Sequence, residues 1–169
     1  MLSAVAAQAK PTLVFTTGRD AFQALVAKTT QSVATHAAIG LGDQLLHAYE
    51  DGVMLDSRDA WFTTRKQLLV AEFAIVPNVD DGIDQALQHV GQKYDAMHVI
   101  KAWLLRTLWP FVRSLGPDRH DRFTCARFVT LIDPNGERIP EWRYLWHEAL
   151  APADLLECAL WGVSFRRMA

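Results

Sequence analysis

Cysteine is scarce in this chain, which has only Cys125 and Cys158 among 169 residues. Neither has another cysteine close to it in the sequence, and the six histidines are scattered, so the ligand spacing typical of a zinc site is absent. We therefore expect no metal and no other cofactor. The two cysteines could pair or stay free, but their small number and the lack of a recognisable signal peptide in residues 1–10 favour a reduced, cytoplasmic or virion-associated protein.

Long apolar runs and a charge excess are also missing. No run reaches the ~18 residues that a membrane span requires, and a net charge of -2 gives no reason to expect nucleic acid or an anionic lipid surface as a partner. Hydrophobic residues make up 50% of the chain, which is enough for the core of one domain. With no repeat or low-complexity segment, we expect a single domain over residues 1–169.

A β-hairpin with one histidine on each strand is the most informative stretch. Residues 33–41 and 45–49 are mostly apolar and flank Gly42-Asp43, a sequence typical of a tight turn between two strands. His36 lies on the first predicted strand and His47 on the second. The two rings face the same side of the sheet if the register allows it, and two such imidazoles can act as a base and its orienting partner.

Further patterns predict an α+β domain, with a small and mostly antiparallel sheet packed on one side by helices. The predicted strands are 12–16, 68–76 and 163–165. The predicted helices are 21–28 after Asp20, 80–91 capped by Asp80-Asp81, 97–109, 123–132 capped by Thr124, and a short one from Pro152. Turns are expected at Asp51-Gly52 and 133–136, and residues 56–59 open a turn or short helix.

Cys125 is the candidate nucleophile. Thr124 as N-cap puts this thiol in the first turn of a helix, where the helix dipole favours a thiolate. A neighbouring imidazole can take its proton, and a second polar group can hold that imidazole in place, so we assign His36 as base and His47 as orienter. The residue types alone also fit a structural role, because single cysteines and histidines are commonly part of a core. Cys158, in an apolar run, is expected to be an inert thiol.

The order of several motifs resembles one protein superfamily. Residues 35–48 contain the pattern H-x-x-I-x-x-G followed by a second histidine, and they are similar to the histidine-bearing hairpin of the circularly permuted NlpC-type papain-like cysteine peptidases and amidases. The same hairpin occurs in the related lecithin retinol acyltransferase group. Three later segments resemble, in order, the Gly-x-x-Tyr-Asp segment, the nucleophile helix and a C-terminal element of the permuted bacterial members: 91–95, 123–129 and 150–155.

The resemblance implies a papain-like α+β fold with Cys125 as nucleophile, His36 as base and His47 as third member of a triad. Tyr94 matches a tyrosine near the oxyanion site of these enzymes. Two features depart from the pattern. Ala126 follows the cysteine where many relatives have Ser, Glu or Asp, and residues 97–121 form a longer link than usual. This helical insertion fits an apolar lid, a lipid or partner surface, or an extra core helix.

Three functions are compatible with the resemblance. The first is a thiol hydrolase of amide bonds, with bacterial peptidoglycan stem peptides as the commonest substrate of the superfamily. The second is an acyltransferase, or a hydrolase of lipid amides or thioesters, acting on an acyl substrate. The third is a structural, cell-wall-facing component of an assembly such as a phage tail tip or a secretion machine. The Cys-His-His set favours the two enzymatic readings.

Overall fold

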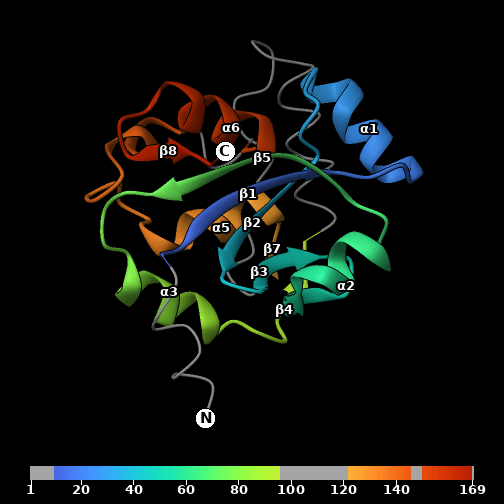
Figure 1. The fold of residues 1–169 in the computed structure, drawn as a ribbon, viewed down its shortest axis with the longest axis horizontal. Coiled ribbons are helices and arrows are strands. Elements are labelled where there is room, and N and C mark those ends of the chain that lie inside the picture. The colour runs from blue at the N-terminus through green and yellow to red at the C-terminus, as the bar shows by residue number, and fades with distance from the viewer. Residues whose placement is uncertain (1–9, 96–121, 146–149, 169) are drawn as a thin grey trace.

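The computed structural model describes residues 10–95, 122–145 and 150–168. Its main feature is a six-stranded sheet in the order β4-β3-β2-β1-β5-β8, in which every neighbouring pair is antiparallel (Figure 1). The antiparallel sheet of an α+β domain is therefore confirmed. The strands of this sheet are β1 Thr12–Thr17, β2 His36–Leu41, β3 Gln44–Tyr49, β4 Gly52–Ser57, β5 Leu68–Ile75 and β8 Phe165–Arg167.

A second, parallel pair joins β6 (Lys93–Tyr94) to β7 (Arg122–Phe123). The pair was not expected from the sequence, because two-residue strands leave no periodic pattern. It fixes the two ends of the chain segment between them, so that Tyr94 lies opposite Phe123, two residues before Cys125. The helix predicted over 97–109 and the insertion 97–121 lie outside the described residues, as do residues 1–9.

Two helices begin at the caps that the sequence predicts, whereas the cap predicted at Asp80-Asp81 is wrong, because Val79 is the N-cap of α3 and makes no side-chain cap hydrogen bond. Asp20 accepts a hydrogen bond from the Gln23 N–H at 2.7 Å at the start of α1, and Thr124 accepts one from the Arg127 N–H at 3.3 Å at the start of α5. These side chains satisfy N–H groups that lack a partner within the helix. The described helices are α1 Ala21–Thr30, α2 Arg58–Thr63, α3 Asp80–Leu87, α5 Cys125–Val129, α6 Pro152–Trp161 and the 3-10 helices η2 Thr130–Ile132 and η3 Pro140–Tyr144.

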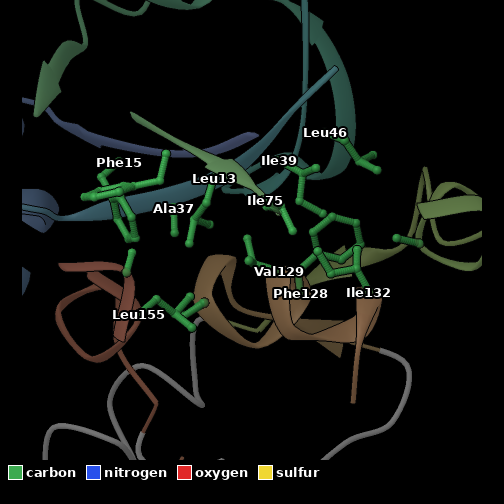
Figure 2. Packing of buried hydrophobic residues seen from close by; sticks show 14 of the residues in the cluster. Leu13, Phe15, Ala37, Ile39, Leu46, Ile75, Phe128, Val129, Ile132 and Leu155 are labelled. Carbon is green, nitrogen blue, oxygen red and sulfur yellow. The ribbon is translucent and has the colours of Figure 1, made fainter. Parts of the chain in front are cut away.

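One face of the sheet carries the main hydrophobic core. Alternate residues of the central strands point to this face, as period-two geometry requires, and they meet α5, η2 and α6 (Figure 2). Phe128 and Leu155 are completely buried there. Figure 2 shows the side chains of the helical elements on one side and those of the strands on the other: Phe128, Val129, Ile132 and Leu155 against Leu13, Phe15, Ala37 and Ile39.

The opposite face has a smaller core of its own, so the expectation of packing on one side only is wrong. Trp61 of α2 is 1% exposed and packs with Val14, Ala38 and Leu45. The helix is tied down further by an ion pair between Arg58 and Glu72 of β5. The helix contacts β3 and β4 and begins directly after β4, whose last residue, Ser57, is its N-cap.

Several predicted boundaries differ from the structure. β2 begins at His36 rather than Val33, whose side chain is 67% exposed. Leu68 and Leu69 begin β5, but their side chains are half exposed, so the start of this strand is not buried as expected. α3 ends at Leu87 instead of 91: the N–H groups of the next three residues bond to carbonyls three positions back, and Gly91 adopts a positive φ of 91°. Such a tightened turn ends a helix.

Two C-terminal boundaries also shift. Phe123 belongs to β7 and not to the helix that follows it, which is only five residues long before it tightens into η2. The last strand begins at Phe165, because Val163 is 89% exposed and Ser164 is instead bonded to Glu141. Within the described residues no helix is long and apolar enough to span a bilayer.

Candidate functional site

Two tight hairpins place His36, His47 and Asp56 on one face of three adjacent strands. The register of β2 and β3 makes the two histidines diagonal neighbours on the same face. In the next hairpin Asp56 of β4 pairs with Leu45, two residues before His47, so this carboxylate is also a diagonal neighbour of the ring. Diagonal positions on a sheet lie within reach of long and aromatic side chains. The three residues therefore form a continuous row across β2, β3 and β4.

The row is joined by hydrogen bonds. Nε2 of His36 lies 3.2 Å from Nδ1 of His47, and Nε2 of His47 lies 3.3 Å from Oδ2 of Asp56. Both rings are buried, with His36 2% and His47 0% exposed, while the Asp56 side chain is 32% exposed. The contact predicted between the two histidines is therefore present, and Asp56 extends it toward solvent.

Aromatic side chains enclose the two imidazoles. The Trp61 ring lies 4.3 Å from the His47 ring and 5.0 Å from the His36 ring, and Tyr49 meets His36 edge-on at 5.3 Å. This apolar surrounding disfavours a positive charge, and burial together with His47 lowers the pKa of His36 well below its usual value. His36 is therefore a neutral imidazole at neutral pH and can accept a proton.

Cys125 is the first residue of α5, where the Thr124 cap places it, and it is 6% exposed. The N–H groups of Ala37, Ala126 and Cys125 itself face the sulfur and act to lower its pKa, but burial outweighs them and raises the pKa of this thiol to about 11. The start of the helix thus favours the thiolate in the expected direction, but burial outweighs it, and the resting thiol keeps its proton. Charge at the end of a helix is worth at most ~2 kcal/mol, which burial of an anion readily exceeds.

The sulfur meets β2 at its backbone. The pairing of β2 with β3 begins at Ile39, which lies opposite Leu46. Ala37 precedes this paired stretch, and its N–H faces the sulfur. Ala37 directly follows His36, so the sulfur of α5 meets β2 at the backbone position next to the residue that carries the imidazole. Within the described residues no hydrogen bond joins the sulfur to either ring, because α5 packs on the main core face and the rings lie on the other face.

Tyr94 lies on the Cys125 side of the site. Burial raises the pKa of its hydroxyl well above the usual value, and the neighbouring Cys125, Tyr49, Glu50 and Asp95 act in the same direction. The phenol therefore keeps its proton and can donate a hydrogen bond. This is the property that a residue near an oxyanion needs.

Cys158 is separate from these residues. It lies on α6, is half buried, and its sulfur approaches the Glu141 carbonyl oxygen at 3.9 Å. Burial raises the pKa of this thiol also to about 11. Both cysteines are free, and among the described residues no group of three His, Cys, Asp or Glu side chains could hold a metal ion.

Asp56 is the residue of this row that sequence reasoning missed. It was expected to open a turn or short helix, whereas it is part of β4. The turn expected at Asp51-Gly52 lies one residue earlier, at Glu50-Asp51, and Gly52 is the first residue of β4. With either placement of a two-residue turn, a strand after it puts Asp56 on the same face as His47. Because the end of β4 is polar, the sequence shows no alternating strand pattern there.

No protein-family model and no curated protein matches the chain.

Proposed function

We propose that this protein is a thiol-dependent hydrolase of amide bonds with a papain-like arrangement of its site. Cys125 attacks the carbonyl carbon, His36 carries the proton, and His47 orients His36. The observation that carries the proposal is the buried pair of imidazoles bonded at 3.2 Å beside the strand position at which the Cys125 sulfur meets the backbone. For this chemistry the thiol, which meets the backbone of β2 from α5, must reach the neutral imidazole of the neighbouring strand residue, because a general base has to contact the proton that it removes.

The reaction proceeds in two halves. As the bond from sulfur to the carbonyl carbon forms, the thiol proton passes to Nδ1 of His36, since Nε2 of this ring is engaged with His47. The carbon–nitrogen bond then breaks, and the departing amine takes that proton from His36. In the second half, water gives a proton to His36 and attacks the thioester. The carboxylic acid leaves, and the sulfur regains its proton.

Negative charge develops on the carbonyl oxygen in both halves. The Cys125 N–H at the start of α5 and the Tyr94 hydroxyl are the donors that we assign to this oxygen. Because thiol and imidazole are both neutral at rest, the proton leaves the sulfur during the attack and not before it. The site therefore works by general-base catalysis instead of a standing thiolate–imidazolium pair.

The substrate class rests on the resemblance of the hairpin and the nucleophile helix to the permuted NlpC-type enzymes. We propose the peptide stems of bacterial cell wall as substrate. The test is digestion of purified peptidoglycan by the intact chain, with mass detection of released stem fragments. Cys125→Ser is expected to abolish release, and Cys158→Ser, the matched control, to retain it with an unchanged circular dichroism spectrum.

Each alternative predicts a different product. Transfer of an acyl group to an amine acceptor, with no release of stem peptides, would favour the acyltransferase function. No cleavage and no transfer by the folded chain would favour the structural role and overturn the enzymatic proposal. Equal loss in both serine variants would show that Cys125 has been wrongly assigned.

A further inference from the structure

The row of hydrogen bonds that begins at Asp56 specifies where the protons lie. Hydrogen bonding to His47, the largest cause, keeps the pKa of Asp56 below its usual value against the effect of burial, and the charge of Arg65 acts in the same direction. Asp56 is thus an ionised carboxylate near neutral pH, and such a group can only accept hydrogen bonds. The partner atom, Nε2 of His47, must therefore carry a proton.

The proton on Nε2 of His47 determines the next hydrogen bond of the row. In the neutral form of this ring, a proton on Nε2 leaves a lone pair on Nδ1. Nδ1 of His47 then accepts, so Nε2 of His36 donates across the 3.2 Å contact. In the neutral His36 this leaves the lone pair on Nδ1. That nitrogen is the one outside the row and hence the one available to the thiol proton.

We propose that Asp56 is a positioning residue that fixes both histidines as Nε2–H tautomers and so leaves Nδ1 of His36 free to act as base. The inference rests on the proposed function only where it assigns Nδ1 of His36 as a base. The tautomers themselves are properties of the folded chain with or without a substrate. Asp56 touches neither thiol nor substrate and acts through His47. Reversal of the row, with Nδ1 protonated on both rings, would leave the site without a base.

The surroundings of Asp56 support this role. Its own strand β4 ends one residue later, at Ser57, and the carboxylate is a third exposed, which keeps it ionised at neutral pH. Among the described residues, the charged side chain that faces Asp56 is Arg65, which follows α2 and is paired with Asp51. Arg65 provides donors only, so it stabilises the carboxylate and cannot replace it as the acceptor for His47.

Nitrogen-15 NMR of the histidine-labelled intact chain tests the proposal, because protonated and unprotonated ring nitrogens have well-separated shifts. In the wild type at pH 7 we expect Nε2 protonated and Nδ1 unprotonated in both His36 and His47. In Asp56→Ala we expect a mixture of the two tautomers. The fraction of Nδ1–H should be the same in both rings, because the contact between them holds one proton, and its position sets the tautomer of each ring. Asp56→Glu is expected to restore the single tautomer.

Asp84→Ala, which removes an exposed carboxylate from α3, is the matched control and should leave the ring shifts unchanged. A wild-type His36 protonated at Nδ1, or rings unaffected by Asp56→Ala, would overturn the proposal. The wild-type result alone decides if the alanine variant does not fold. Cys125→Ser should preserve both tautomers, so a chain with the expected tautomers but no peptidoglycan cleavage would refute the proposed function and not the role of Asp56.

Discussion

The reactivity of Cys125 toward a small alkylating agent is predicted quantitatively by its burial. Cys158→Ser leaves Cys125 as the sole thiol of the chain. With a pKa of about 11, Cys125 is ionised in only about one molecule in 10,000 at pH 7, whereas a free thiol with a pKa of ~8.5 is ionised in about 3%. Since the thiolate is the reactive form, iodoacetamide should modify Cys125 about 300-fold more slowly than a cysteine peptide.

The assay is the second-order rate of alkylation between pH 6 and pH 9, followed by intact mass. The rate should rise tenfold per pH unit over this whole range without a plateau, because the pH stays below the pKa of the thiol. A rate at pH 7 equal to or above that of the peptide, with a plateau below pH 8, would reveal a standing thiolate. That result would refute the general-base mechanism in its present form and favour a preformed ion pair with His36.

Two further predictions concern stability. In Gly82→Ala the new Cβ would lie 1.9 Å from the Ile132 carbonyl oxygen, so α3 must move away from η2. Urea unfolding should show a loss of about 1–3 kcal/mol in the free energy of unfolding, and an unchanged midpoint would contradict this packing. Because the folded-state pKa of Asp56 is lowered, its contribution to stability is present above the unfolded pKa of about 3.8 and is lost as the pH falls through the lower folded value. The difference in unfolding free energy between wild type and Asp56→Ala should thus be constant between pH 5 and pH 7 and shrink below pH 4, and a difference that grows on acidification would exclude the carboxylate as its source.

The hairpin was predictable because local chemistry specifies it. Gly42 adopts a positive φ of 65° in a two-residue turn, a conformation that glycine adopts without strain. Once the turn length is known, the face of every later residue follows from the period of two, and with it the meeting of His36 with His47. The caps at Asp20 and Thr124 were predictable for the same local reason.

Features that depend on the whole fold were not predictable from the sequence. The raised pKa of Cys125 follows from its burial between α5 and β2, elements that are almost 90 residues apart in the chain. Trp61 covers the second face of the sheet because α2 folds back, and nothing in its sequence distinguishes the two faces. Asp56 was missed at the point where a strand passes directly into a helix, since a mixture of polar and apolar residues is compatible with both.

The central claim is that Cys125 is a nucleophile served by His36, and detection of the acyl-enzyme tests it most directly. The intact chain would be mixed with an activated peptide ester, quenched with acid and analysed by intact mass and peptide mapping. We predict a hydroxylamine-sensitive acyl group on Cys125 that forms at least tenfold more slowly in His36→Ala and is absent in Cys125→Ser. An acyl group on Cys158 instead, or equal rates of formation with and without His36, would contradict the claim.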